Sequence, residues 1–176
     1  MASIGIFYGS SSGVTKAVAE RLAELLDVED FNVFNMEEDF TDFDDMFAFD
    51  ILLFGCSTWG SGEVQNDWRD PLLDLDNDKP SFAGKTIALF GAGDFKAHGE
   101  QFVSALGILH DKFKARGATL VGGFPTEGYT YKYSFAERDG KFVGLPFDEV
   151  NEADKTEERL QRWVAILQEE LALAEA

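Results

Sequence analysis

The fold is decided by residues 4–15, which read IGIFY, GSSSG and VT in succession. The first five form an apolar run without polar alternation, which is typical of a strand buried on both faces of a sheet. From Val14 onward, apolar residues recur every three or four positions as far as Leu26, and this spacing predicts an amphipathic helix. A strand and a helix are therefore joined by a short loop of glycines and hydroxyl side chains.

The same alternation of strand and helix continues along the chain. Further strands are predicted at residues 31–34, 51–55, 86–91 and 119–122, and further helices at 67–75, 102–116 and 156–173. Strands that are apolar on both faces and alternate with helices form a parallel sheet that is covered on both sides. We therefore expect an α/β fold, a doubly wound five-stranded parallel sheet with helices on both faces.

Residues 123–151 interrupt this alternation because they are rich in glycine and aromatic side chains. We interpret the segment from about 123 to 142 as an insertion that interrupts the last strand, with residues 141–145 returning to the sheet. Since the insertion is too short to form a domain, residues 1–176 are expected to form a single domain. The tail at 171–176 is predicted to be frayed.

Composition limits the classes of function. The 33 Asp and Glu residues outnumber the 15 Lys and Arg residues and give a formal charge of −18. This acidity argues against nucleic-acid binding and against docking on anionic membranes, and it favours basic protein partners. The only cysteine is Cys56, so an intramolecular disulfide and a paired-cysteine metal site are excluded. With no signal peptide or membrane-length apolar run in view, we expect a cytoplasmic protein without a metal ion.

The loops that follow the first, third and fourth predicted strands are unusual in sequence. In a doubly wound fold, ligands bind beyond the carboxyl ends of the strands, so these loops are the candidate site. The first loop, 9–15, offers hydroxyls and a helix N-terminus, which together bind anions such as phosphate. It lacks the Gly-Lys-Ser/Thr of a phosphate-binding Walker sequence. An ordinary serine-rich helix cap is the alternative interpretation.

The other two loops suggest that the phosphate belongs to a nucleotide. The second loop carries Trp59 between glycines, where it could stack on a flat ligand or fold back on the core. The third, 91–101, has glycines that allow close backbone approach, together with Asp94 and His98. Taken together, the three loops predict a mononucleotide site for a flat heterocycle.

With these motifs, the sequence resembles a flavodoxin of the long-chain type over nearly its whole length. Residues 10–15 are similar to the phosphate loop of the family, residues 58–63 and 91–94 to its two isoalloxazine loops, and residues 126–129 and 140–145 to landmarks of the long-chain insertion. The resemblance implies a flavodoxin-like fold and non-covalently bound FMN that cycles between semiquinone and hydroquinone. It implies a monomeric, low-potential one-electron carrier that shuttles electrons between a reductase and acceptor redox proteins, and not an enzyme.

The resemblance also implies roles for individual residues. The hydroxyls of the first loop would hold the phosphate, Trp59 would cover one face of the ring, and the Gly60–Ser61 peptide would face flavin N5. His98 stands where many flavodoxins have a tyrosine, and it would cover the other face. The predicted cofactor-binding residues are Ser10, Ser11, Ser12, Gly13, Val14, Thr15, Ser57, Thr58, Trp59, Gly60, Ser61, Gly62, Gly91, Ala92, Gly93, Asp94, His98 and Gln101.

Basic-patch redox proteins are the predicted partners, and an acidic rim would receive them. Its candidate residues are Glu63, Asp67, Asp70, Glu100 and Asp148. The alternative function is an FMN-dependent two-electron quinone or NAD(P)H oxidoreductase on a similar fold. A phosphoacceptor receiver domain is set aside, because Gly55 and Cys56 occupy the places where acidic residues would be required.

Overall fold

The computed structural model describes residues 2–175, except for the side chains of residues 173–175. Its central sheet has the strand order β2-β1-β3-β6, and β7 and β11 both pair with β6. All pairs within this sheet are parallel. The strands are β1 (Ile4–Tyr8), β2 (Val33–Asn35), β3 (Ile51–Gly55), β6 (Thr86–Ala92), β7 (Thr119–Val121) and β11 (Leu145–Phe147).

β7 and β11 are two halves of one position in the sheet. β7 pairs with residues 86–88 of β6, and β11 pairs with residues 90–92. Five strand positions result, as predicted. The insertion between the halves has its own antiparallel sheet of β8 (Phe124–Pro125), β9 (Glu137–Arg138) and β10 (Lys141–Phe142). The predicted return at residue 141 is therefore wrong, because β10 pairs within the insertion and the chain rejoins the main sheet only at Leu145.

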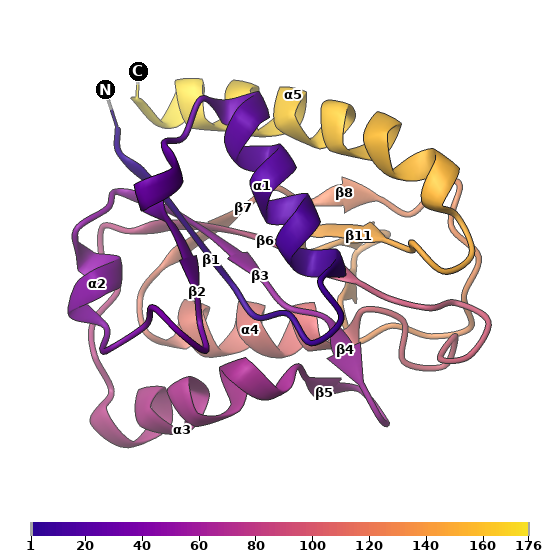
Figure 1. Cartoon of the computed structure of the whole chain (residues 1–176), viewed down its shortest axis with the longest axis horizontal. Helices are drawn as coiled ribbons and strands as arrows, with labels where there is room; N and C mark the ends of the chain where they lie inside the picture. Colours follow the sequence, from indigo (N-terminus) through magenta and orange to yellow (C-terminus); the bar gives the residue numbers. More distant parts are fainter. Residues whose placement is uncertain (1, 176) are drawn as a thin grey trace.

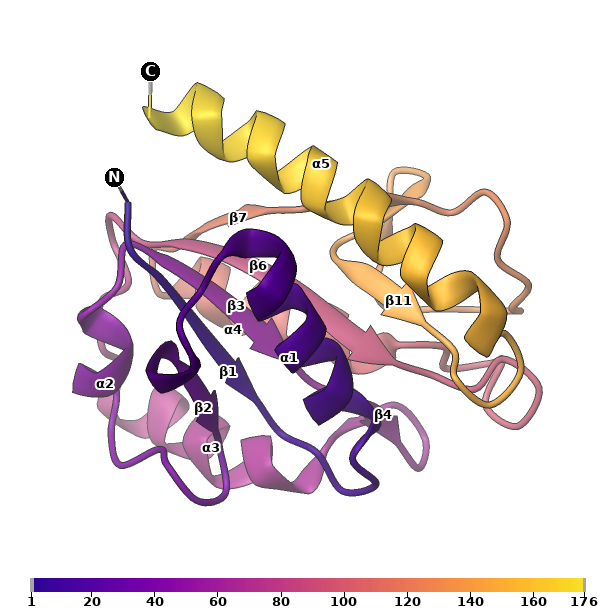
Figure 2. The ribbon, with the colours of Figure 1, turned by 45° about the horizontal axis from the view of Figure 1, so that its top comes forward.

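Helices cover both faces of the sheet (Figures 1 and 2). On one face lie α1 (Val14–Leu26) and α5 (Thr156–Glu175), and on the other lie α3 (Arg69–Asp78) and α4 (Ser104–Ala115). The shorter elements are α2 (Asp44–Phe47), the hairpin of β4 (Thr58–Trp59) and β5 (Glu63–Val64), and the 3₁₀ turns η1 (Asp30–Asn32), η2 (Asn66–Trp68) and η3 (Ala153–Lys155).

The core consists of two apolar layers, one on each side of the sheet. Successive residues of a strand point to opposite faces, so Ile6 packs with Leu22 and Trp163 beneath α1 and α5. Phe7 belongs to the other layer, which contains Phe54, and all five side chains are fully buried. Each such side chain contributes about 1.5–3 kcal/mol relative to an exposed one.

Two predicted boundaries differ from the structure. β2 begins at Val33, because residues 30–32 form a 3₁₀ turn that leaves Phe31 exposed. The helix predicted to end at residue 173 continues to Glu175, and Leu171 is buried against the core, whereas fraying of the tail stays a prediction. Residue 176 lies outside the described residues. Over 2–175, none of the helices combines the length and apolar character that crossing a bilayer requires.

Candidate functional site

The first loop presents unpaired backbone donors at the start of α1. Gly13 is the N-cap residue with φ 89°, a left-handed conformation that suits glycine, and its own N–H donates to Ser10 Oγ at 3.0 Å. The N–H groups of Ser11, Ser12, Val14 and Thr15 have no hydrogen-bond acceptor among the described residues. Free N–H groups at the positive end of a helix dipole form a site for an anion such as a phosphate.

Two side chains from the segment before α3 hold this loop in place. Gln65 is fully buried, and its Nε2 donates to Ser11 Oγ at 2.9 Å. The Asp67 carboxylate accepts a hydrogen bond of 3.2 Å from Ser10 N. A Cβ at Gly9 would collide with the Gln65 side chain, which explains the glycine there. Gln65 was not predicted from the sequence, because nothing local distinguishes it from a surface glutamine.

The second loop presents an exposed indole. Trp59 ends β4 with 48% of its surface exposed, and its Nε1 donates to Ser57 Oγ at 2.8 Å. Thr58 Oγ1 accepts from Ala105 N of α4 at 2.9 Å, which anchors the hairpin to that helix. The alternative of a tryptophan folded back on the core is therefore wrong for Trp59, whereas Trp68 is fully buried.

The third loop is a turn built on Asp94. Its Oδ1 accepts hydrogen bonds from the N–H groups of Lys96 (3.1 Å) and Ala97 (3.0 Å), and its carbonyl oxygen accepts from His98 N at 2.8 Å. These bonds fold residues 94–98 so that His98 lines the site. Phe102 occupies the space where a Cβ on Gly93 would lie, so that position requires glycine.

The three loops meet around one hollow of about 210 Å³ at the carboxyl edge of the sheet. Its lining includes eleven of the predicted residues: Ser11, Ser12, Val14, Thr15, Ser57, Thr58, Trp59, Ala92, Gly93, Asp94 and His98. Helix donors, an indole and an imidazole therefore share one cavity. A ligand with a phosphate at one end and a flat ring at the other fits this arrangement.

Seven predicted residues lie outside this lining, and their cofactor contacts stay predictions. Gly60, Ser61 and Gln101 line an adjoining hollow of about 670 Å³ toward the insertion. Gly62 packs against Gln101, and Gly91 packs against the carbonyl of Cys56. The other two, within the first loop, are Ser10 and Gly13.

The structure adds two residues to the lining and corrects the predicted rim. Glu149 and Val150, in the loop after β11, line the hollow, although no motif singles them out. Asp148 is fully buried and accepts four hydrogen bonds. Its predicted place on the acidic rim is therefore wrong, because a fully buried carboxylate cannot contact a partner protein. Glu63, Asp70 and Glu100 are exposed, and Asp67 is half-buried.

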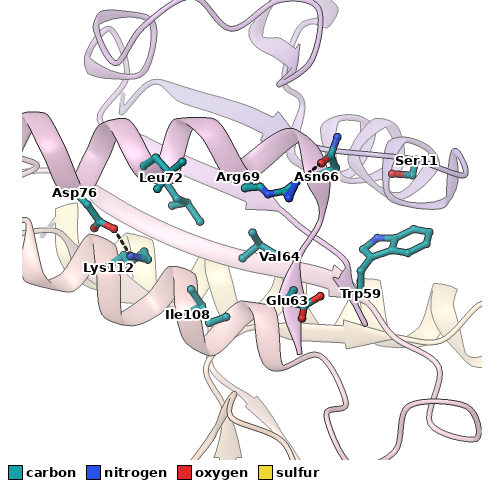
Figure 3. A pocket seen from close by; sticks show the side chains of 11 residues that line it. Ser11, Trp59, Glu63, Val64, Asn66, Arg69, Leu72, Asp76, Ile108 and Lys112 are labelled. Carbon is teal, nitrogen blue, oxygen red and sulfur yellow. Dashed lines mark hydrogen bonds and ion pairs between the residues drawn. The ribbon is translucent and has the colours of Figure 1, made fainter. Parts of the chain in front are cut away.

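A larger hollow of about 680 Å³ lies between α3 and α4 (Figure 3). Trp59 and Ser11 stand at one end of it, and an ion pair between Lys112 and Asp76 (2.6 Å) stands at the other. Its lining includes no residue of the third loop. We therefore place the ring in the smaller hollow, where all three loops take part.

The charges around the smaller hollow are mainly acidic. Its lining contains Asp94 and Glu149 but no Lys or Arg from the described part of the chain. Burial acts to raise the pKa of Asp94, but hydrogen bonds from Ala97 N, the Asn151 side chain and Lys96 N outweigh it and hold the pKa below its ordinary value. Burial also raises the pKa of the Cys56 thiol to about 12, so this group stays protonated and inert.

Fold and site together define a class, a doubly wound protein that binds a mononucleotide with a flat ring. The comparisons give the family. The flavodoxin family model matches residues 6–163. Flavodoxin 1 of Azotobacter vinelandii is 78% identical over 97% of this chain and 98% of its own, and a flavodoxin of Picosynechococcus is 43% identical over 95% and 96%. The chain belongs to the flavodoxin family.

The solved structures agree with this assignment. The Fusobacterium nucleatum flavodoxin, whose crystal structure is described as bound to flavin mononucleotide, superposes with a TM-score of 0.87 at 30% identity. The match covers 97% of this chain and 99% of that one. The predicted flavodoxin-like fold is confirmed.

Proposed function

We propose that this chain is a low-potential one-electron carrier that holds FMN non-covalently and passes electrons from a reductase to acceptor redox proteins. The observation that carries the proposal is the meeting of a phosphate-binding helix N-terminus with Trp59 and His98 in one hollow. Family membership and the FMN-bound relative support FMN as the cofactor. When bound, FMN supplies the redox chemistry, since it accepts and releases electrons one at a time.

The protein's own residues bind and orient the cofactor. The free N–H groups of residues 11, 12, 14 and 15 and the nearby hydroxyls would hold the phosphate, so its charge meets neutral donors and a helix dipole. Trp59 and His98 would flank the ring. Because the lining has no Lys or Arg in the described chain, negative charge added to the ring would gain no cationic partner there. This environment favours a low potential for the second electron.

Stepwise anaerobic reduction of the FMN-loaded protein, followed by its visible spectrum, tests the proposal. We expect two separate one-electron steps with distinct spectral changes. A single two-electron step would instead support the quinone or NAD(P)H oxidoreductase, which the flavodoxin relatives do not favour. If FMN cannot be loaded at all, the proposed site is wrong.

The acidic rim supplies the docking surface for the partners. Glu63 and Glu100 are exposed and line the two larger hollows beside the site, and Asp70 is exposed in the first turn of α3. Together with the net charge of −18, they would attract partners that carry basic patches. A monomer in the cytoplasm, which catalyses no reaction of its own, is the form in which we propose that the carrier works.

A further inference from the structure

A fourth loop lines the hollow, although it contains none of the predicted cofactor residues. This loop follows β11 and spans residues 148–151. Glu149 and Val150 line the hollow, whereas Asp148 and Asn151 form hydrogen bonds within the protein. The outer two residues thus hold the inner two in position.

Asp148 is a fully buried carboxylate without a cation within ion-pair distance in the described chain. Burying such a group is costly unless hydrogen bonds satisfy it. Its Oδ2 accepts from Phe95 N (2.9 Å) and Asn151 Nδ2 (2.9 Å), and its Oδ1 accepts from Val150 N (3.2 Å) and Asn151 N (2.9 Å). One of these donors, Phe95, belongs to the third loop, so Asp148 joins two loops.

Asn151 makes the second connection between the same loops. Its Nδ2 donates to Asp148 Oδ2 at 2.9 Å and to Asp94 Oδ1 at 2.7 Å. Since both partners are carboxylates, only the NH₂ of the amide can face them. The amide therefore bridges two negative groups that would otherwise repel each other, and hydrogen bonds to charged groups are stronger than neutral ones.

The bridge ends on the residue that shapes the third loop. Asp94 binds the N–H groups of Lys96 and Ala97 and directs the turn that places His98 in the lining. On the other side, the bond from Val150 N to Asp148 keeps Val150 at the hollow with 74% of its surface exposed. Val150 therefore presents an apolar surface at the hollow that a bound ligand can contact.

We propose that Asp94, Asn151 and Asp148 form a latch that positions the ring-binding surface, with Val150 as a further contact for the flavin ring. Asp148 and Asn151 are positioning residues, since they act through the third loop and through Val150. The proposal rests on the proposed function, because it assumes that the hollow takes a flavin. It differs from a purely structural role in one respect: the latch should affect binding of the ring and leave binding of the phosphate unchanged.

Asn151→Ala tests the latch by removing both bonds of the amide. Dissociation constants for FMN and for riboflavin, which lacks the phosphate, are measured by quenching of flavin fluorescence. We expect both affinities to fall by about tenfold, in line with the loss of hydrogen bonds to charged groups. The visible circular dichroism of the bound flavin should also change, because the surroundings of the ring change.

Two variants serve as controls. Ser12→Ala, in the phosphate loop, should weaken the binding of FMN and leave the binding of riboflavin unchanged. Asn35→Ala removes a half-buried asparagine at the end of β2 whose Oδ1 accepts from Glu37 N at 2.9 Å, outside the hollow, and both affinities should stay unchanged. Thermal unfolding of each apoprotein shows whether it is folded. If Asn151→Ala does not fold, Asn151→Ser is used, because it keeps one donor. This variant should lower the affinity for both flavins by roughly threefold.

Equal losses of affinity for FMN and riboflavin in Asn151→Ala, with altered circular dichroism, support the latch. Unchanged affinities and circular dichroism in a folded Asn151→Ala protein overturn it, and so does a loss confined to FMN. A wild-type protein that binds neither flavin contradicts the proposed function itself, which separates the two failures.

Discussion

Gly60 stands at the tip of the β4–β5 hairpin with φ 55°, a conformation that side chains with a Cβ rarely adopt. A Cβ there would also collide with the Glu63 carboxylate. We expect Gly60→Val to cost about 1–2 kcal/mol of stability. In the proposed site the Gly60–Ser61 peptide faces flavin N5, and a Cβ on residue 60 should hinder the peptide from turning its carbonyl toward N5 when the first electron is added. The two one-electron potentials should then approach each other by roughly 50 mV, which a stepwise reductive titration would measure.

A second glycine separates the cost in stability from the effect on the potential. Gly84 has φ 84° with open space around its Cβ position and lies before β6, at the opposite end of that strand from the third loop. Gly84→Val should lower the free energy of unfolding by a similar amount and leave both potentials unchanged. Equal potentials in wild type and Gly60→Val would remove the assigned role of Gly60.

Asp94 makes the latch sensitive to acid. Its pKa is lowered in the folded protein, because hydrogen bonds from Ala97, Asn151 and Lys96 outweigh the effect of burial. A carboxylate with a depressed pKa contributes stability above its unfolded pKa of about 3.9 and loses that contribution as pH falls through the folded value. We expect the free energy of unfolding to decline below about pH 4, and Asp94→Asn to reduce the slope of this decline. Chemical denaturation at pH 7 and in steps below pH 4 measures both, and equal slopes would contradict the role of Asp94.

α5 holds the insertion through one buried cation. Arg159 lies 3.9 Å above the ring of Tyr129, donates to Gly128 O at 3.1 Å and pairs with Glu152 at 3.2 Å. Tyr129 OH in turn donates to Pro146 O of β11 at 2.7 Å. The insertion is thereby attached both to a helix and to the main sheet.

Arg159→Leu should loosen this attachment. Because it removes one partner of a buried ion pair, we expect a loss of about 2 kcal/mol, less than for an isolated pair, since Lys155 still binds Glu152. Hydrogen exchange should accelerate within 123–142 and stay unchanged in β1 and β3. Arg162→Leu is the matched control on the same helix, because Arg162 is exposed and lies 5.3 Å from the Phe124 ring. Equal effects of the two variants would contradict the special role of Arg159.

The elements of the main sheet could be predicted because each carries its own local signal. The strands at 4–8 and 51–55 and the helix at 14–26 were predicted with the bounds that the structure shows, since apolar runs and helical spacing reflect burial directly. The hairpin at Trp59 and the sheet of the insertion consist of strands of only two residues each. Strands of this length leave no periodic pattern in the sequence.

The site was predictable in its loops and not in the groups that support them. Glycines, hydroxyls and Trp59 at the ends of apolar runs mark a ligand site in the sequence itself. Asp148 and Gln65 do not, because they form hydrogen bonds to partners that are 53 and 54 residues away in the chain. A surface acid and a buried hydrogen-bonded one have the same local sequence signal, and for this reason Asp148 was assigned to the rim.

The loops that bind the ligand and the apolar core that stabilises the fold lie in different parts of the molecule. The carboxyl ends of β1, β3 and β6 bear the three predicted loops and β11 bears the fourth, whereas the apolar layers lie beneath the helices. Acidic groups occur at both edges, but only those near the hollow lie where a redox partner must approach the ring. The net charge of −18 would therefore attract a basic partner from a distance, and the exposed acids near the loops would orient it.

This division predicts how electron transfer responds to salt. Rates with a basic reductase should fall as ionic strength rises, because exposed charges are screened beyond a Debye length of about 10 Å at 0.1 M. The double variant Asp70→Asn with Glu100→Gln should have a lower rate and a shallower dependence on salt, measured by stopped-flow spectroscopy. Glu29→Gln with Asp30→Asn removes the same charge after α1, at the opposite edge of the sheet, and should change the rate little. If both double variants slow transfer equally, net charge alone attracts the partner, and the acids around the hollow form no docking surface.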